Sequence, residues 1–413
     1  MEDSSIQILI VGAGIMGLTV ARKLVETGFD HIGIIEKEPD VGYHASGRNS
    51  GVLHAGIYYA PDSVKATSCL RGNLKMQQYC REKGLPLENT GKVIVARSAS
   101  ELPVLESLFE RARANGAKVD LISEKTLESI EPNAKTVRQA IYSHYTSVVD
   151  PKKVLQALRA DLEKSGRVRF FFGHCFQGLK GSTAILTHRG KIGFRYLINA
   201  AGAHSDKIAK AFGLGNHFRL IPFKGIYHKL VNHRAHLVKG SIYPVPDIRN
   251  PFLGVHFTRN VYGDVYLGPT AIPAFGRENY GLFQGIDHEG PQILFNDARL
   301  FYYNKKFRNV ALTEPRKYLF PWFFRDAAQL VKRLEPSDVE PSPKAGIRAQ
   351  LVDWRTKELV QDFCLLKNSV SLHILNPVSP AFTSSMDLAE KIVGEFKTMI
   401  GGNDKLQMDI MNG

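Results

Sequence analysis

Cysteine is scarce in this chain of 413 residues, which contains only Cys69, Cys80, Cys175 and Cys364. No two of them form a C-x-x-C pair and their spacing is irregular. The sequence therefore suggests neither a disulfide framework nor a zinc site built on cysteines. We expect a protein of a reducing compartment.

Long apolar runs are also missing. The N-terminal run IQILIV, residues 6–11, is far shorter than the roughly 20 apolar residues that a membrane-spanning helix needs. The acidic residues Glu2 and Asp3 stand where a transit peptide would carry arginines. We therefore expect neither a targeting segment nor a membrane span.

Negative charge is outnumbered, with 40 Asp and Glu against 54 Lys and Arg and a net charge of +14. The surplus favours a small anion, lipid head groups or nucleic acid as partner. A non-catalytic nucleic-acid-binding protein would gather its basic residues among aromatics. Here they are dispersed, with the densest group at 304–308, so we expect no nucleic-acid partner.

A glycine-rich turn follows the first apolar run. Residues 12–17, GAGIMG, match G-x-G-x-x-G between a predicted strand and a predicted helix over 15–26. These glycines allow a tight turn and bring the backbone close to a pyrophosphate at the helix N-terminus. Glu36 ends the next predicted strand, where a carboxylate accepts hydrogen bonds from a ribose. We predict a site for NAD or FAD; a glycine turn without a ligand is the alternative.

The residues after this strand favour FAD over NAD. The segment 43–59, YHASGRNSGVLHAGIYY, is rich in small and polar residues, which suits a backbone lying against a large planar ligand. An NAD-binding domain would usually continue directly into a helix. A plain surface loop is the alternative, but it would not need the apolar residues at 52–53 and 57–59.

The rest of the pattern predicts two domains, a number that fits both the length and an ordinary globular composition with 44% hydrophobic residues. A helix over 151–165, a strand over 167–172 and a strand and glycine turn over 191–202 continue the doubly wound pattern. Strands dominate from about 216 to 340, including a hairpin within 253–268.

Two helices, over 291–304 and 315–334, interrupt these later strands, and the proline-rich stretch 335–343 is the best linker candidate. The predicted fold class is α/β, with a Rossmann-like FAD-binding domain and a sheet-rich α+β substrate domain, both discontinuous. We assign residues 1–80, 147–215 and 340–413 to the first domain, and 81–146 and 216–339 to the second.

Several motifs together resemble the FAD-dependent D-amino-acid-oxidase-type superfamily and, more narrowly, the L-2-hydroxyglutarate dehydrogenase family. They are spread over nearly the whole chain. Besides residues 12–17, they are SGRNSGVLHAGIYY at 46–59, TGKVIVA at 90–96, VD at 149–150, IPFKG at 221–225, YPVPD at 243–247, PFLGVHFT at 251–258, KAGIRAQ at 344–350 and NPVSPAFTSS at 376–385. Lys224 stands where that family usually has arginine.

The resemblance implies oxidation of L-2-hydroxyglutarate, a small 2-hydroxy dicarboxylate, to 2-oxoglutarate. FAD is the implied cofactor and takes the hydride, and a quinone or other acceptor receives the electrons. An FAD-dependent amino-acid or amine oxidase of the same fold is the alternative function.

The positive charge left over after substrate and cofactor are neutralised would suit anionic lipid. We therefore expect peripheral contact on the cytoplasmic side of an inner membrane. A mitochondrial location is expected only if the chain is a processed form.

Removing a hydride from a secondary alcohol requires a base for the hydroxyl proton. His54 follows the flavin-facing segment directly, and an imidazole pKa of about 6.5 suits this task; a core histidine bonded to a carbonyl is the alternative. His256 is the second candidate. On its predicted strand it shares a face with Thr258, opposite Val255 and Phe257, and that face either lines a pocket or meets solvent.

Arg348 is the third residue expected in the catalytic site, because a guanidinium presents paired donors to a carboxylate. Superfamily members commonly place a G-x-R segment of this kind beside the flavin, and a surface arginine is the alternative. The residues expected to contact substrate are Tyr59, Lys224, Tyr243, Thr258 and Arg348.

The segment 379–385 precedes a predicted helix that ends near Lys397. The N-terminus of this helix would favour negative charge on a reduced flavin. Ordinary capping of the helix is the alternative explanation for the Ser and Thr residues of this segment. His44 is similar to a histidine that carries flavin covalently in some distant relatives. The residues expected to bind the cofactor are Gly12, Gly14, Gly17, Glu36, Lys37, Ser46, Arg48, Asn49, Ser50, Gly51, Val52, Gly202, Gly346, Pro380 and Thr383.

A metal site is not expected. His228, His233 and His236 are close in sequence, but neither a helical nor a strand period places all three on one face.

Overall fold

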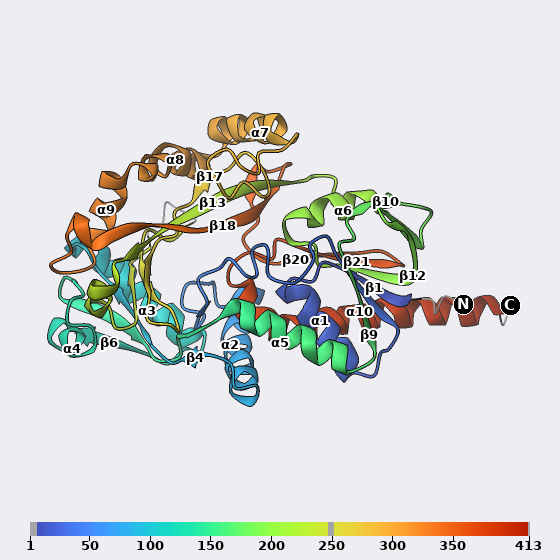
Figure 1. Cartoon of the computed structure of the whole chain (residues 1–413), viewed down its shortest axis with the longest axis horizontal. Helices are drawn as coiled ribbons and strands as arrows, with labels where there is room; N and C mark the ends of the chain where they lie inside the picture. Colours follow the sequence, from blue (N-terminus) through green and yellow to red (C-terminus); the bar gives the residue numbers. More distant parts are fainter. Residues whose placement is uncertain (1–5, 247–251, 412–413) are drawn as a thin grey trace. The chain divides into compact units, whose positions relative to one another are not determined.

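The computed structural model describes residues 6–246 and 252–411, without the side chains of 402–411. Asp247 and Pro251, which belong to two of the motifs above, lie outside the described residues. The chain divides into two compact units (Figure 1). Unit 1 comprises Met1–Gly47, Pro151–Leu220 and Ala349–Gly413, and unit 2 comprises Arg48–Asp150 and Ile221–Arg348.

This division differs from the predicted domains mainly at residues 48–80, which lie in unit 2. The reason is the packing of α2 (Val64–Glu82). The buried Asn73 amide on this helix donates hydrogen bonds to the carbonyls of Leu53, His54 and Tyr145 at 2.9–3.0 Å. A buried amide held by three carbonyls of unit 2 fixes the helix there.

Unit 1 is built on a parallel sheet. β1 (Ile6–Val11) lies between β2 (Ile32–Glu36) and β12 (Gly190–Asn199), and β9 (Val168–Phe172) and β21 (Ser371–Leu375) extend the two sides. All four pairings are parallel. The apolar run of the first strand is buried from Ile8 to Val11, as expected for a strand covered on both faces.

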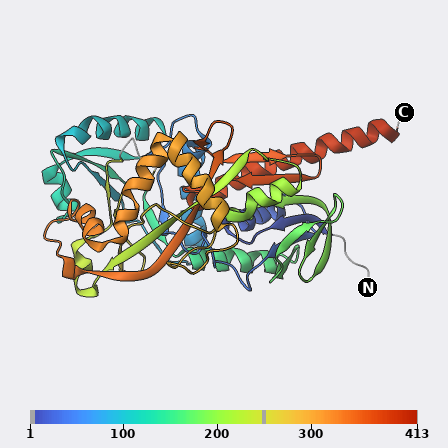
Figure 2. The same ribbon diagram turned by 90° about the horizontal axis from the view of Figure 1, so that it is seen from above.

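Helices cover this sheet. α1 spans Ile15–Glu26, the range that the apolar period predicts, and it contacts both α5 (Pro151–Lys164) and α10 (Ala381–Met411). Figure 2 shows α10 as one continuous helix. The smaller elements of unit 1 are β10 (Phe176–Leu179), β11 (Ala184–Thr187), α6 (Ser205–Ala211), β19 (Glu358–Leu359) and β20 (Cys364–Lys367).

Unit 2 holds most of a mixed ten-stranded sheet. In sheet order its strands are β19, which belongs to unit 1, β18 (Val339–Asp353), β13 (Phe218–Leu230), β16 (Val265–Leu267), β15 (Phe257–Arg259), β14 (Ser241–Pro244), β5 (Lys92–Val95), β7 (Gln139–Ser143) and β6 (Val119–Ser123), with β17 (Ile272–Pro273) paired to β13. β15 and β16 are antiparallel neighbours, which confirms the predicted hairpin. β3 (Val52–Leu53), β8 (Ser147–Val149) and β4 (Leu87–Glu88) form a separate small sheet.

Both faces of the large sheet are covered. Val93 and Val95 pack with Phe257 in one hydrophobic cluster, while Ile94 packs with Tyr243 in another. Strand alternation therefore sends neighbouring residues of β5 into different cores. The helices of unit 2 are α2, α3 (Leu102–Ala114), α4 (Glu124–Ile130), α7 (Gly290–Tyr303), α8 (Lys305–Thr313) and α9 (Phe320–Ala328).

The predicted helix over 291–304 corresponds to α7, but the prediction was wrong at two later points. The helix predicted over 315–334 is shorter, because a 3-10 turn at Pro315–Tyr318 precedes α9. α8 was missed; the Asn304 side chain accepts a hydrogen bond from the Phe307 N–H at 2.8 Å and so caps a new helix.

The predicted linker at 335–343 is also wrong. A short 3-10 turn leads into β18 at Val339, and Pro341 and Pro343 lie on exposed positions of this strand. In the described ranges, no helix is long and apolar enough to span a bilayer.

Candidate active site

Two positions accept only glycine, one in the turn after β1 and one in the first turn of α1. Gly12 has φ +105°, and a Cβ there would lie 2.7 Å from the Ala200 carbonyl oxygen. A Cβ on Gly17 would lie 1.9 Å from the Gly12 carbonyl oxygen. Side chains are thus excluded where the backbone must approach a diphosphate, so the turn fits a bound dinucleotide.

Two predicted cofactor residues meet the start of α1. The Ala13 N–H donates to a carboxylate oxygen of Glu36 at 2.9 Å, and the Ile15 N–H donates to Ser46 Oγ at 2.9 Å. A carboxylate at the end of β2 beside the first amides of this helix is the arrangement that the motif predicts for a ribose and a pyrophosphate.

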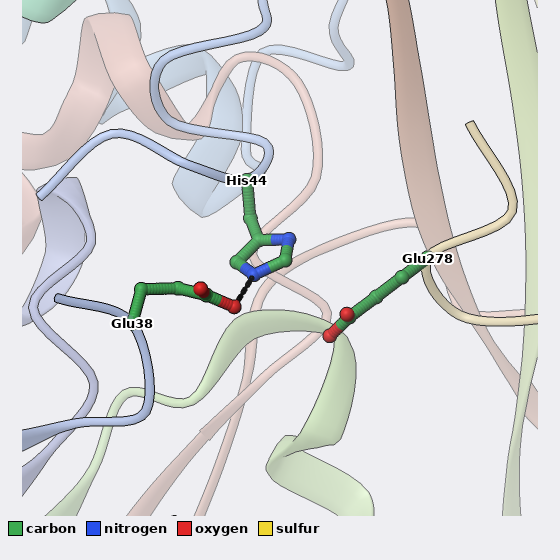
Figure 3. A group of neighbouring side chains, drawn as sticks. All are labelled: Glu38, His44 and Glu278. Atoms are coloured by element: carbon green, nitrogen blue, oxygen red, sulfur yellow. Dashed lines mark hydrogen bonds and ion pairs between the residues drawn. The ribbon is translucent and has the colours of Figure 1, made fainter. Parts of the chain in front are cut away.

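Lys37 and His44 belong to a charged group after β2. Glu38 accepts from Lys37 and lies 2.8 Å from His44 Nε2 (Figure 3). Burial alone would raise the pKa of Glu38, but hydrogen bonds from Lys37 and His44 outweigh it and lower the pKa. These contacts fix the loop, and the predicted cofactor role of Lys37 remains a prediction.

The predicted cofactor residues Arg48–Val52 lie in unit 2 and fold on themselves. The Asn49 side chain accepts from the Gly51 N–H at 2.8 Å, and Ser50 Oγ lies 3.4 Å from the Val52 nitrogen. Val52 begins β3 and pairs with β8. The Arg48 guanidinium stacks over the Tyr280 ring, 4.1 Å from its centre.

The remaining predicted cofactor residues flank chain turns. Gly14 is the N-cap of α1, and Gly202, with φ +54°, lies in the turn after β12. Pro380 and Thr383 are buried at the start of α10. In unit 2, a Cβ on Gly346 would lie 3.2 Å from the Arg48 carbonyl oxygen.

Unit 2 gathers basic and aromatic side chains from distant segments. Lys92 begins β5 and is only 1% exposed. Its Nζ lies 4.7 Å from the centre of the Tyr58 ring and 4.8 Å from that of the Tyr243 ring. The Tyr243 ring in turn stacks on His256, with the ring centres 3.9 Å apart and the planes inclined by 29°.

His256 and Thr258 are 5% and 4% exposed, so their face of the strand does not meet solvent. The His256 Nδ1 lies 2.8 Å from the Gly254 carbonyl oxygen. Because a carbonyl only accepts hydrogen bonds, Nδ1 carries the proton, and Nε2 holds the lone pair of the neutral ring.

The electrostatics keep both candidate bases neutral. Burial, followed by the charges of Lys92, His256 and Arg348, lowers the pKa of His54 well below its usual value. Burial lowers the pKa of His256 to about 4, although its bond to Gly254 opposes the shift. Near pH 7 both imidazoles are therefore unprotonated and able to accept a proton.

Two cations of this cluster have no carboxylate partner among the residues that the structure describes. Arg348 is half-buried, its guanidinium lies 5.0 Å from the centre of the Phe252 ring, and burial lowers its pKa while Tyr59 and Tyr227 oppose the shift. Within residues 6–246 and 252–401, neither Lys92 nor Arg348 forms an ion pair with an acidic side chain. A dianion is the complementary ligand for such a cluster.

Lys224, predicted to bind substrate, donates hydrogen bonds to a loop of unit 2. Its buried Nζ donates to the Gly281 carbonyl at 2.7 Å and to the Asn279 side chain at 3.3 Å, and burial lowers its pKa. These contacts fasten the loop around 279–281. The substrate role of Lys224 therefore remains a prediction without a described contact to the cluster.

Sequence reasoning missed Lys92, Tyr58 and Tyr227 as members of the cluster. Burial raises the pKa of both tyrosines. The charge of Tyr227 opposes the lowering of the Arg348 pKa that burial causes. The available signal was the strand KVIV, in which alternation places Lys92 on the face of Ile94. A lysine that starts an apolar run is usually read as exposed.

The three clustered histidines do not converge. His228 packs on Phe323, with ring centres 4.3 Å apart, and His236 Nδ1 lies 2.8 Å from the carbonyl oxygen of His233. No residue of this group is placed to share an ion with the other two in the described structure.

Comparison with known proteins adds the family. The family model described as FAD dependent oxidoreductase matches residues 7–357. The L-2-hydroxyglutarate dehydrogenase of Indibacter alkaliphilus is 36% identical, over 92% of this chain and 96% of its own. The mitochondrial human enzyme of that name is 35% identical, over 95% of this chain and 89% of its own.

This chain belongs to the L-2-hydroxyglutarate dehydrogenase family of FAD-dependent oxidoreductases. Membership confirms the resemblance drawn from the motifs, and it makes the chain an enzyme with FAD as its cofactor.

Solved structures agree on the fold. The FAD-bound L-alpha-glycerophosphate oxidase of Mycoplasma pneumoniae superposes with a TM-score of 0.73 at 20% identity, over 94% of this chain and 93% of that one. Glycine oxidase from Geobacillus kaustophilus gives 0.68 at 17% identity, with the same coverage. The predicted mixed α/β fold of this family is thus confirmed.

Proposed function

We propose that this protein oxidises L-2-hydroxyglutarate to 2-oxoglutarate. The observation that carries the proposal is the cluster of unit 2, where Lys92 and Arg348 have no acidic partner among the described residues and lie in the same cluster as two neutral histidines. A 2-hydroxy dicarboxylate brings two negative charges to these cations and a hydroxyl proton to a histidine. The named relatives of this family point to the same substrate.

The chemistry assigns a role to each group. Arg348 holds a substrate carboxylate through paired N–H donors and so orients the hydroxyl-bearing carbon. His54 takes the hydroxyl proton as the C–H bond breaks with its electron pair, which leaves the 2-oxo acid. His54 is favoured over His256 because it is half-buried and can be reached, whereas His256 is enclosed and stacked on Tyr243.

Unit 1 supplies the residues that would hold the cofactor. The glycine turn at 12–17 would receive the pyrophosphate, Glu36 a ribose, and Ser46 would remain beside the first amide of α1. When bound, FAD supplies the acceptor for the two electrons and the hydrogen released from the substrate carbon.

The reaction is tested by dye reduction with purified holoenzyme. L-2-hydroxyglutarate is compared with its D enantiomer and with a panel of amino acids. We expect turnover of the L-hydroxy acid alone. Turnover of amino acids without the hydroxy acid would replace this proposal by an FAD-dependent amino-acid or amine oxidase.

A peripheral membrane contact is the second part of the proposal, and α7–α9 are the surface that supports it (Figure 1). Residues 290–326 contain seven Lys or Arg and three Asp or Glu. Asp297 and Glu314 are buried, and Asp326 lies 3.4 Å from Lys317. The exposed charge of this surface is therefore positive.

Large apolar side chains are exposed among these charges. They are Leu294, Phe295, Phe301, Tyr302, Tyr303, Leu312, Tyr318, Leu319 and Trp322. The guanidinium of Arg325 stacks 4.3 Å from the Trp322 ring centre. Exposed aromatics interleaved with arginine and lysine suit the interface of an anionic bilayer. Such a location on the cytoplasmic side would let a membrane quinone take the electrons.

Vesicle flotation tests the contact. Phosphatidylcholine vesicles with or without phosphatidylglycerol are compared at low and high salt, with wild type, Phe295→Ser/Trp322→Ser and the control Leu74→Ser, which changes an exposed leucine of α2. We expect wild type and Leu74→Ser to bind only the vesicles that contain phosphatidylglycerol, and the double variant not to bind. A double variant that instead changes only the oligomeric mass would identify a contact between copies. Transfer of electrons to a short-chain quinone tests the acceptor.

A further inference from the structure

Lys92 is a buried cation without an acceptor. Its Nζ has no hydrogen-bond partner among the described residues, and its side chain is 1% exposed. The faces of Tyr58 and Tyr243 lie on it at 4.7 and 4.8 Å and attract the charge only weakly compared with a carboxylate. Such an ammonium holds its proton loosely.

Among the described residues, the titratable side chains that share this cluster with Lys92 are neutral or positive, apart from the Cys69 thiol. Tyr58 comes from the loop after β3, Tyr243 from β14, His256 from the approach to β15, and Arg348 from β18. His54 directly follows β3, and within the part of the chain that the structure describes, Cys69 on α2 is the group whose charge would stabilise the ammonium.

Burial lowers the pKa of Lys92 to about 7, with Cys69 opposing the shift. At neutral pH the protein therefore contains both charged and neutral Lys92. A dianion entering the cluster favours the charged form, and the pKa then rises. Binding of the anion and uptake of a proton are consequently linked.

Resting on the proposed function, we propose that Lys92 takes up a proton when the dianionic substrate binds. It thereby supplies, beside Arg348, the second positive charge that selects a dicarboxylate. Lys92 is a positioning residue that acts through its charge on substrate and histidines. The same charge keeps His54 and His256 unprotonated in the loaded site.

Calorimetry of the holoenzyme with glutarate, a dicarboxylate that lacks the hydroxyl to be oxidised, measures the proton directly. At pH 7, titrations in phosphate and in Tris differ by the ionisation heat of the buffer times the protons taken up. We expect net proton uptake of less than one proton per glutarate in wild type. The control Lys118→Met, which changes an exposed lysine before β6, should match wild type, and Lys92→Met should show almost none.

Unchanged proton uptake in Lys92→Met, or none in wild type, would overturn the proposal. This readout does not depend on turnover. If wild type fails to oxidise L-2-hydroxyglutarate but takes up the proton with glutarate, the proposed reaction fails while the role of Lys92 stands.

Substrate selectivity separates charge from packing. In Lys92→Met, we expect kcat/KM for L-2-hydroxyglutarate to fall by about 30-fold or more and that for L-2-hydroxybutyrate by less than about threefold. Lys92→Arg should keep the preference for the dicarboxylate. If kcat/KM falls equally for both substrates in Lys92→Met, the preference for the dicarboxylate is unchanged. Lys92 would then contribute only to the packing of the cluster.

Discussion

The two units build their sites by different means. The nucleotide turn of unit 1 uses backbone: glycines that exclude Cβ atoms and amides at the start of α1, all within 12–17. The basic cluster of unit 2 uses side chains from residues as distant as His54 and Arg348. A site built from backbone can therefore be predicted from a short sequence motif. A site built from side chains of distant segments can be recognised only once the strands that carry them are in place.

Gly17→Val is the substitution expected to have the largest effect, because it removes the backbone site of unit 1. The Cβ would overlap the Gly12 carbonyl, so the turn cannot form, and we expect loss of bound flavin and of more than about 1,000-fold in activity. Visible absorbance and thermal unfolding measure the effect. A yellow, active variant would show that the close approach does not matter.

His54→Asn is the matching change in unit 2. Loss of a general base costs about 10²–10⁴-fold in kcat, and because no backbone contact is altered we expect flavin to stay bound. Stopped-flow reduction with L-2-hydroxyglutarate gives the rate. His233→Asn, on the exposed 3-10 turn, serves as control and should behave as wild type.

Arg348→Lys keeps the charge but removes the paired donors. We expect kcat/KM to fall by about 10–100-fold, mostly through a higher KM. Steady-state kinetics decide the matter. An unchanged KM would place the carboxylate elsewhere.

The pH profile should separate the cluster from an ordinary histidine. The pKa of His54 is lowered in the folded protein, so the base form persists as pH falls, and activity is lost only below the usual imidazole value of about 6.5. We expect kcat/KM to remain near its plateau at pH 6. An acid limb centred at pH 6.5 or above would contradict this electrostatic account.

Ser46→Ala should have the smallest effect. It removes one hydrogen bond to the Ile15 N–H, which is worth about 1 kcal/mol. We expect FAD to bind about fivefold more weakly with kcat unchanged. Fluorescence titration of the apoprotein measures the affinity, and a loss of kcat instead would assign Ser46 to the chemistry.

Much of the fold was predictable because local rules decide it. The bounds of α1 and the end of β2 at Glu36 follow from apolar period and turn residues. The prolines at 341 and 343 were misread as a linker, because a strand with exposed positions accommodates proline where no donor is required. Residues 48–80 were assigned to the wrong unit, since the contacts of Asn73 are long-range.

The candidate site was less accessible to sequence reasoning. Whether His256 lines a pocket or faces solvent depended on the pairing of β14 with β15 and on the stacking of Tyr243 on His256, and neither contact is local in sequence. Lys92 carried no recognisable chemistry in the sequence, because the two rings that lie against it, Tyr58 and Tyr243, come from distant parts of the chain. Glycine motifs specify their own geometry, whereas buried charges depend on the completed fold.

The order of segments in unit 1 also bears on biosynthesis. β21, which pairs with β12 inside the sheet, and α10, which contacts α1, both come from the last segment, Ala349–Gly413. A nascent chain on the ribosome therefore carries an unfinished sheet until this segment has emerged. Premature termination within this segment would leave the edge of β12 without its parallel neighbour, a form open to aggregation and proteolysis.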